Sequence, residues 1–162
     1  GIAQFATEGQ VIAAGTPGLT LATLPTQDIA APRIGSAASD VLTGGNGADL
    51  IWGGAGNDTV SGGAGNDILA GGAGADRLTG GDGADVFVFS GDSPQDVVTD
   101  FELGTDRIDL GRWGRIYDVS SLSIQEKPDG AEVYFRGLSL RLITENGQRL
   151  HAEDLTNDSF LF

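Results

Sequence analysis

Cysteine is absent from the 162-residue chain, and histidine occurs once, as His151. Without cysteine, the protein has no disulfide bonds, no thiol catalysis and no zinc site with cysteine ligands. One histidine cannot form a metal cluster alone, so we expect His151 at or near the surface. The chain also lacks any run of roughly 20 apolar residues, the length that crosses a bilayer. These absences exclude a disulfide-stabilised scaffold and predict no membrane span.

Basic side chains are scarce: 9 lysines and arginines stand against 23 acidic residues, for a formal net charge of −14. A chain this acidic repels nucleic acid and anionic membranes, so we expect neither as a partner. The excess charge is concentrated in residues 34–110, which hold thirteen acidic residues and two arginines. The same segment is the richest in glycine, of which the chain contains 27. One structural explanation must therefore account for both the charge and the glycine.

Familiar catalytic motifs are missing from the sequence, which contains no HExxH, GxSxG or GxxxxGK. We therefore expect this chain not to be an enzyme, while a catalytic domain elsewhere in a full-length protein stays open. The cluster RWGR (112–115) has two interpretations. It is either a recognition patch for an acidic polymer or partner, or a packed tryptophan flanked by solvated arginines.

Residues 44–88 consist of a nine-residue repeat. Five units follow one another without a gap: GGNGADLIW (44–52), GGAGNDTVS (53–61), GGAGNDILA (62–70), GGAGADRLT (71–79) and GGDGADVFV (80–88). A degenerate unit, GSAASDVLT (35–43), precedes them. Every unit has aspartate at position six and a large apolar residue at position eight. A flexible glycine-rich linker would not keep two chemically opposite positions in register.

This repeat predicts an all-β fold with a right-handed parallel β-roll in residues 34–90. Positions seven to nine are expected to form a three-residue strand, and the other six residues a turn in which glycine permits positive φ. Because such short strands cannot stand alone, unit n must stack on unit n+2. The stacked position-eight residues are Leu42, Val60 and Leu78 on one sheet and Ile51, Leu69 and Phe87 on the other. We expect residues 1–33 to be an N-terminal arm or linker and residues 91–162 to form a β-rich C-terminal cap.

Stacked turns bring together the carboxylates of alternate units. The expected pairs are Asp49 with Asp67, Asp58 with Asp76, Asp67 with Asp85 and, more weakly, Asp40 with Asp58. Strands about 4.8 Å apart would hold these like charges close together, at a cost of several kcal/mol per pair for a protein-like dielectric. A hard divalent cation between the turns reverses the sign of this interaction.

Two carboxylates with several backbone carbonyl groups make the shell of six to eight oxygens that is typical of Ca²⁺, whereas Mg²⁺ demands a tighter octahedral site. The sequence therefore predicts several calcium ions, about four or more. The predicted ligands within the repeats are Asp40, Gly44, Asn46, Asp49, Gly53, Ala55, Asp58, Gly62, Gly63, Ala64, Gly65, Asp67, Gly71, Gly72, Gly74, Asp76, Gly80, Gly81, Gly83 and Asp85.

The five units match GGxGxDxUx, and on this motif the chain resembles the RTX, or hemolysin-type, calcium-binding repeat proteins. The resemblance continues through DVVTDF (96–101) and GTDRIDL (104–110). These segments are similar to the region after the roll in serralysin-type proteases and in the R-modules of alginate epimerases. The resemblance implies that Asp96 and Asp100 complete the last calcium sites. It also implies a secreted protein, outside the cell or on the surface of a bacterium.

Beyond residue 110 the sequence predicts antiparallel strands. Apolar and polar residues alternate in AEVYFR (131–136) and LSLRL (138–142), with a turn or bulge at Arg136-Gly137. The chain ends in DSFLF (158–162). An acidic residue followed by apolar residues looks like the uncleaved signal that type I secretion systems read in secreted proteases and lipases. The same residues also suit a terminal β-strand, and the two interpretations are compatible.

Three functions fit these observations. The favoured one is a non-catalytic calcium-binding module that passes a type I exporter unfolded and folds outside the cell. The first alternative is a calcium-dependent structural module of a surface layer, adhesin or filament, which would associate with itself or with a surface partner. The second alternative is the C-terminal module of a secreted protease, lipase or epimerase.

Overall fold

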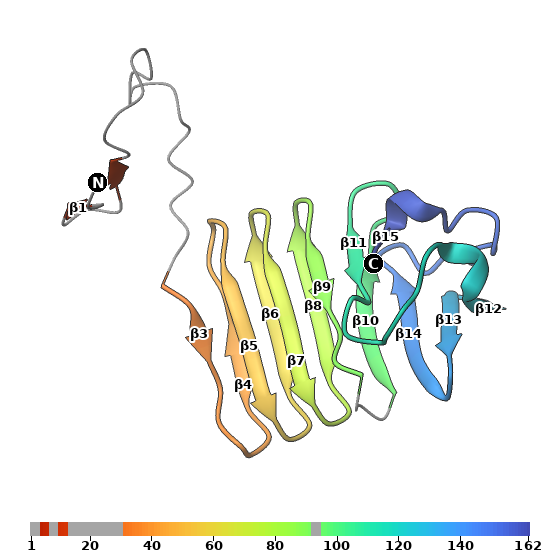
Figure 1. Ribbon diagram of the computed structural model, residues 1–162, viewed down its shortest axis with the longest axis horizontal. Helices are drawn as coiled ribbons and strands as arrows, with labels where there is room; N and C mark the ends of the chain where they lie inside the picture. The colour runs from red at the N-terminus through yellow and green to blue at the C-terminus, as the bar shows by residue number, and fades with distance from the viewer. Residues whose placement is uncertain (1–3, 7–9, 13–30, 92–94) are drawn as a thin grey trace, which may run out of the picture.

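The computed structural model describes residues 4–6, 10–12, 31–91 and 95–162, and its regular elements are strands apart from two short 3-10 turns (Figure 1). Strands β1 (Gln4–Ala6) and β2 (Gln10–Ile12) form an antiparallel pair. Most of the expected N-terminal arm, residues 1–33, lies outside the described residues. Within the described part of the chain, no helix has the length and hydropathy needed to span a bilayer.

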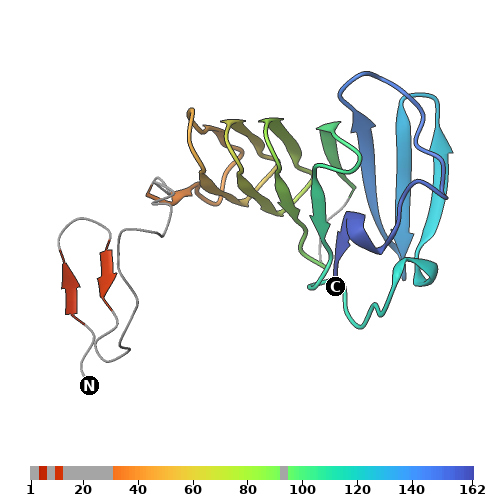
Figure 2. The ribbon, with the colours of Figure 1, turned by 90° about the horizontal axis from the view of Figure 1, so that it is seen from above.

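The repeats form two parallel sheets that face each other, as Figure 2 shows from above. One sheet contains β4 (Val41–Thr43), β6 (Thr59–Ala64), β8 (Arg77–Asp82) and β10 (Asp96–Phe101). The other contains β3 (Arg33–Ile34), β5 (Leu50–Ala55), β7 (Ile68–Ala73), β9 (Val86–Val88) and β11 (Arg107–Asp109). Successive units alternate between the sheets, so each unit pairs with the second unit after it. The predicted parallel β-roll is confirmed.

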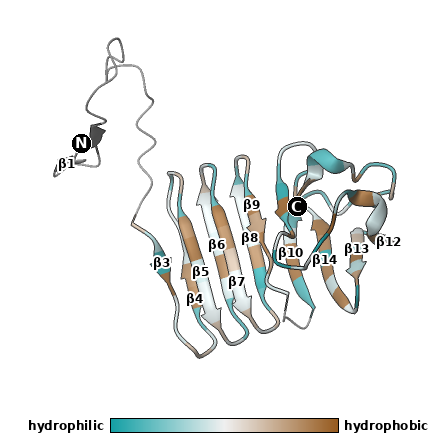
Figure 3. Cartoon of the chain, in the orientation of Figure 1, coloured by the Kyte–Doolittle hydropathy of each residue, from teal (hydrophilic) through white to brown (hydrophobic). Residues whose placement is uncertain are grey.

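Position eight points into the roll, as the sequence predicts. Ile51, Val60, Leu69, Leu78 and Phe87 are fully buried, and they pair in the expected register between the strands of each sheet. Leu42, in the first unit, is only partly buried. Burying such a side chain stabilises the fold by about 1.5 to 3 kcal/mol, so each coil of the roll contributes a small core. Figure 3 shows hydrophobic segments, in brown, on the strands of the roll.

Strands β5 to β8 have six residues each, because they continue through the first three positions of the next unit. Gly54 pairs with Gly72, and Gly63 with Gly81. The position-two glycine adopts a positive φ, 111° at Gly54, and turns the chain while neighbouring backbone groups stay hydrogen-bonded. The expectation of three-residue strands is therefore wrong for these units, because the low strand propensity of glycine hides pairing that the stacked coils impose.

The C-terminal region extends both sheets. Strands β12 (Ser123–Lys127), β13 (Gly130–Phe135) and β14 (Leu138–Thr144) are antiparallel, and β14 pairs in parallel with β10. The predicted hairpin is confirmed: Arg136 and Gly137 form a two-residue turn with φ of 49° and 89°. After the 3-10 turns η2 (Val119–Ser121) and η3 (Asn157–Ser159), strand β15 (Phe160–Leu161) pairs with β11. Buried residues of this region join the repeat core in one cluster, so they cap the end of the roll.

Candidate metal centre

The position-six aspartates form two columns, one for each set of alternate units. In the first column, the Oδ1 atoms of Asp58, Asp76 and Asp96 accept the backbone N–H groups of Asp40, Asp58 and Asp76 at 2.8 to 2.9 Å. In the second column, the Oδ1 atoms of Asp67, Asp85 and Asp106 accept the N–H groups of Asp49, Asp67 and Asp85 at 2.8 to 3.0 Å. The predicted pairs are therefore brought together, and each carboxylate is fixed by the backbone of the coil before it.

These carboxylates are buried. The exposed fraction is 4% or less for Asp49, Asp58, Asp67, Asp76, Asp85, Asp96 and Asp106. Burial raises the pKa of Asp67 and Asp76, and it raises the pKa of Asp85 to about 7 and of Asp106 to about 6. Neighbouring carboxylates add to these rises, while the backbone N–H donors oppose them without cancelling them. Among the described residues, no arginine or lysine forms an ion pair with Asp58, Asp67, Asp76 or Asp85, so the charge of these carboxylates is not compensated by a side chain.

The second oxygen of each central carboxylate has no hydrogen-bond partner. In the described residues, these buried atoms are Asp49 Oδ1 and the Oδ2 atoms of Asp58, Asp67, Asp76 and Asp85. An unsatisfied buried acceptor costs about 1 to 3 kcal/mol, and more when it is charged. Within the described part of the chain, Asp49 alone has a cationic side chain near this atom: Arg33 Nε lies 4.0 Å from its Oδ1. A row of such atoms indicates that a cation belongs between the coils.

The first glycine of a unit leaves space for these oxygens. A Cβ added to Gly62 would overlap both Asp67 Oδ2 and the carbonyl oxygen of Gly80. Gly53 repeats this arrangement with the equivalent oxygens one unit earlier. A carboxylate oxygen and a carbonyl oxygen from two stacked coils thus converge on one small volume that a larger residue would fill.

This donor set fits a hard cation with many oxygen ligands. Among the described residues, no group of three or more histidine, cysteine or acidic side chains could hold a metal by itself. The shell must therefore combine pairs of carboxylates with backbone carbonyls, which suits Ca²⁺ and does not suit zinc. The aspartates of the two columns and the glycine carbonyls beside them are the residues that would hold calcium, which would supply the positive charge that the columns lack.

The remaining predicted ligands lie in the turns or beside the columns. Asn46, Ala55 and Ala64 occupy position three of their units. In two later units the position-three residues are Ala73 and Asp82, and their carbonyl groups accept backbone N–H groups from the neighbouring coil. Gly63, Gly65, Gly72, Gly74, Gly81 and Gly83 have positive φ and approach the backbone of the preceding coil. Gly44 and Gly71 occupy position one, beside the carboxylates of Asp49 and Asp76. The carbonyl groups of these turn residues stay predicted ligands.

Asp96 and Asp100, which the resemblance groups together, occupy different places. Asp96 continues the first column above Asp76. Asp100 lies outside both columns, and its two oxygens accept the N–H groups of Gly80 and Gly81 at 2.9 and 2.8 Å. Its charge adds to the pKa rise at Asp85, so it lies near the end of the second column.

Asp106 is a column residue that the sequence analysis missed. It follows Asp85 in the second column, and its Oδ2 accepts the N–H of Glu102 at 2.9 Å. The spacing of GTDRI (104–108) could have indicated it. This segment repeats positions four to eight of the nonapeptide, G-x-D-x-apolar, but lacks the glycines of positions one and two. The segment DVV (96–98) carries the same aspartate and apolar spacing. Both columns therefore continue beyond the last regular unit.

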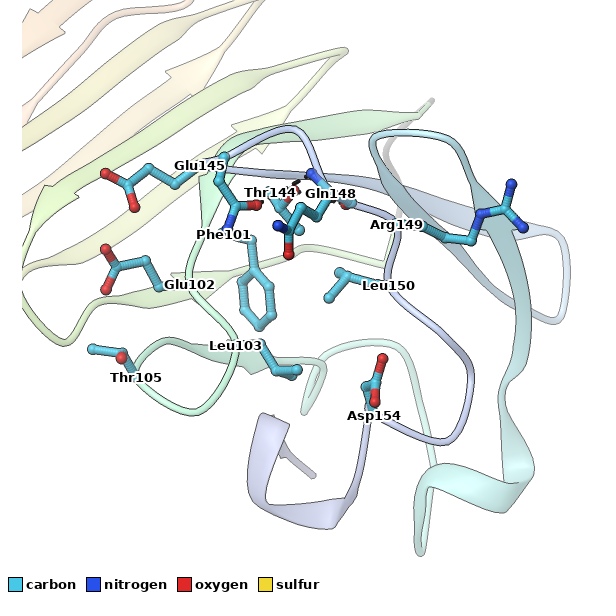
Figure 4. Close-up of a pocket in the computed structure, with 11 residues that line it drawn as sticks. Phe101, Glu102, Leu103, Thr105, Thr144, Glu145, Gln148, Arg149, Leu150 and Asp154 are labelled. Atoms are coloured by element: carbon cyan, nitrogen blue, oxygen red, sulfur yellow. Dashed lines mark hydrogen bonds between the residues drawn. The ribbon is translucent and has the colours of Figure 1, made fainter.

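Other candidate residues lie apart from the columns. His151 is exposed, and its Nδ1 lies 3.2 Å from Glu126 Oε1. Trp113 is 6% exposed and donates its Nε1–H to the Ser90 carbonyl, so it is a packed tryptophan. A hollow of about 370 Å³ beside the end of β10 contains Glu102 and Glu145 (Figure 4). Hydrogen bonding with Glu102 raises the pKa of the exposed Glu145 carboxyl group.

Comparison with known proteins supports this site. The family model of the RTX calcium-binding nonapeptide repeat matches residues 34–69 and 61–93. No curated protein matches the chain. Among solved structures, the AlgE6R2 subunit of the Azotobacter vinelandii mannuronan C5-epimerase is 31% identical, with 82% of this chain and 92% of that chain covered and a TM-score of 0.67.

The AlgE6R3 subunit of the same epimerase is 32% identical, with 79% of this chain and 80% of that chain covered and a TM-score of 0.57. The two stacked columns of aspartates agree with the matched motif. The chain belongs to the family of RTX calcium-binding nonapeptide repeat proteins.

Proposed function

We propose that this chain is a non-catalytic module whose folding depends on calcium. The observation that carries the proposal is the row of buried carboxylate oxygens without partners in the described residues. Six stacked carboxylate pairs offer positions for the four or more ions that we expect. Each ion that binds only the folded state adds RT ln(1 + [L]/Kd) to stability, so several sites together decide whether the roll forms.

Calcium concentration would then decide where the chain folds. Extracellular calcium modules bind with Kd of about 10⁻⁴ to 10⁻³ M. The calcium concentration outside the cell is high enough to fill such sites, whereas the cytosolic concentration is far too low. We infer that the chain leaves a bacterial cell unfolded through a type I exporter and folds outside. The segment DSFLF (158–162), in which an acidic residue precedes apolar ones, supports this route.

A calcium titration tests the proposal. Circular dichroism should change from coil to β-structure as calcium rises to the millimolar range, and calorimetry should report several ions per chain. Magnesium at equal concentration should have a much smaller effect, because it retains water and demands octahedral geometry. A β spectrum that persists unchanged in chelator would refute calcium-dependent folding.

A second candidate function follows from the likeness to epimerase subunits. We propose that the module serves as an accessory part of a larger secreted enzyme. The coding sequence upstream of Gly1 tests this directly, since a catalytic domain there would support it. The surface-layer or filament alternative instead requires assembly that depends on calcium. If light scattering shows that the calcium-loaded chain stays monomeric at high concentration, this alternative is contradicted.

A further inference from the structure

The two outer faces of the roll differ in chemistry. Residues at positions seven and nine point outward, because position eight points inward. On the β4–β6–β8–β10 sheet, the outward residues are Val41, Thr43, Thr59, Ser61, Arg77, Thr79, Val97 and Thr99. On the β3–β5–β7–β9 sheet, they are Ile34, Leu50, Trp52, Ile68, Ala70, Val86 and Val88. One face is thus dominated by hydroxyl groups, and the other, which we call the apolar face, by aliphatic and aromatic side chains.

The apolar face contains a groove of about 240 Å³, lined among others by Ile34, Leu50, Trp52, Ile68 and Arg112. Several of these side chains are exposed: Ile34 by 68%, Trp52 by 49% and Ile68 by 44%. The Trp52 ring lies across the next strand, where a Cβ on Gly72 would be 2.9 Å from its Nε1. Neighbouring apolar side chains exposed on one flat sheet face are typical of an interaction surface.

Arginines flank the apolar face at both ends. Arg33 lies in the first strand, β3, and Arg112 lines the opposite end of the groove. Arg107 extends the row of Leu50, Ile68 and Val86, since it pairs with Val86 in register. The nearby anions are Asp109, whose carboxylate accepts the N–H of Gly111 at 2.8 Å, and Asp49, whose Oδ1 lies 4.0 Å from Arg33 Nε, so three cationic groups stand against two anions.

This charge pattern disfavours a second copy as the occupant. A two-fold axis along the strands would place Arg33 of one copy against the Arg107 and Arg112 end of the other. An axis along the stack would place each arginine against its own equivalent. Both arrangements oppose like charges, so the complementary partner carries carboxylates at the ends of an apolar stretch. Aliphatic side chains in the groove favour a polypeptide over a sugar polymer, because they match apolar side chains and offer sugars no hydrogen bonds.

We propose that the apolar face binds a polypeptide segment that is apolar in its centre and acidic at its ends, and that it does so only when calcium has folded the roll. The calcium requirement rests on the proposed function, because the outward rows exist only while the coils are stacked. Unfolded chain separates Trp52, Ile68 and Arg112, so no groove remains. Calcium would then control recognition as well as folding.

Fluorescence anisotropy with a labelled synthetic peptide tests the proposal. The probe is a peptide with two glutamates at each end and a central stretch of four residues in which valine and threonine alternate. A matched peptide carries lysines in place of the glutamates. In millimolar calcium, the acidic peptide should bind at least tenfold more tightly than the basic one. Trp52→Ala and Arg112→Glu should each weaken binding at least tenfold. Arg77→Glu is the matched charge reversal on the opposite face and should leave binding unchanged.

Circular dichroism of every variant keeps the result independent of folding. If calcium folds the chain and neither peptide binds, the docking proposal is overturned while calcium-dependent folding stands. If the chain is folded in chelator and binds the acidic peptide there, control by calcium is refuted. Binding of polygalacturonate in preference to the acidic peptide, or a calcium-dependent dimer that Trp52→Ala abolishes, would also overturn the choice of partner.

Discussion

Each central aspartate of a column uses its two carboxylate oxygens differently. In Asp67, Oδ1 accepts the N–H of Asp49, whereas the buried Oδ2 has no hydrogen-bond partner. The Oδ1 atom thus fixes the position of the carboxylate. The Oδ2 atom lies beside the Gly80 carbonyl oxygen, and a Cβ on Gly62 would overlap both. Asn at this position would preserve the first contact and remove the charge.

Asp67→Asn should therefore raise the calcium concentration at the midpoint of folding several-fold. Asp67 stands between Asp49 and Asp85 in the second column, so one substitution weakens two neighbouring ion positions. A calcium titration followed by circular dichroism measures the shift. Asp82→Asn is the matched control, because Asp82 is an exposed position-three residue. An equal midpoint for both variants would contradict the assignment of Asp67 as a ligand.

Gly62→Ala should reduce calcium-induced folding more than Gly104→Ala. A Cβ on Gly62 would overlap Asp67 Oδ2 and the Gly80 carbonyl, whereas Gly104 has φ of 85° and nothing within 4 Å. Gly104→Ala therefore reports only the backbone strain of positive φ, which costs roughly 1 kcal/mol. Thermal melts in saturating calcium compare the two variants. A larger loss for Gly104→Ala would indicate that the space beside the carboxylate is unimportant.

At the scale of strands, β15 closes the end of the roll. Phe160 is 3% exposed and pairs with Ile108, and its ring stacks on Phe162 with centroids 5.8 Å apart. The strand therefore protects the edge of β11 and covers part of the core. A terminal segment that packs in this way has a structural role whether or not an exporter also reads it.

Removal of residues 160–162 should lower the melting temperature in calcium, because loss of a buried aromatic side chain costs about 3 to 5 kcal/mol. Scanning calorimetry of the purified chain measures this without any secretion step. Phe162→Ser is the control, since Phe162 is 42% exposed and its loss removes only the stacking on Phe160, worth about 0.5 to 1.5 kcal/mol. Equal stability of the truncated and intact chains would leave the segment with no structural role.

Much of the fold at this scale could be predicted from sequence, because the period of nine residues determines which side chains stack. The position-eight core and the pairing of Asp49 with Asp67 follow directly from it. Asp106 could not be found in the same way, because its separation from Asp85 is 21 residues, whereas the separation within the repeats is 18. The place of Asp100 depends on the loop between β9 and β10, whose length the repeat does not determine.

For the whole molecule, the columns make stability depend on pH. Burial raises the pKa of Asp85 to about 7 and of Asp106 to about 6 in the folded chain without calcium, from an unperturbed value of 3.8. A carboxyl group whose pKa is higher in the folded state binds its proton more tightly there. Its contribution to stability is present below about pH 4 and is lost as the pH rises through about 7.

In chelator, any residual folded structure should therefore be more stable at pH 5 than at pH 8. In saturating calcium the order should reverse, because protons compete with the ion for the same oxygens. Circular dichroism in chelator and urea unfolding in calcium, each at both pH values, measure the two orders of stability. An increase in stability with pH in chelator would contradict the raised pKa values.

Because units alternate between two sheets, odd-numbered units lie on one sheet and even-numbered units on the other. Insertion of two nonapeptides would add one complete coil and leave every later unit on its original sheet. Insertion of one nonapeptide would move every later unit to the opposite sheet and exchange the apolar face with the hydroxyl face from that point onward. An insertion between residues 52 and 62 would thus place Trp52 and Ile68 on different sides of the molecule. Evolution by duplication of this repeat can therefore preserve its outer surfaces only in steps of eighteen residues.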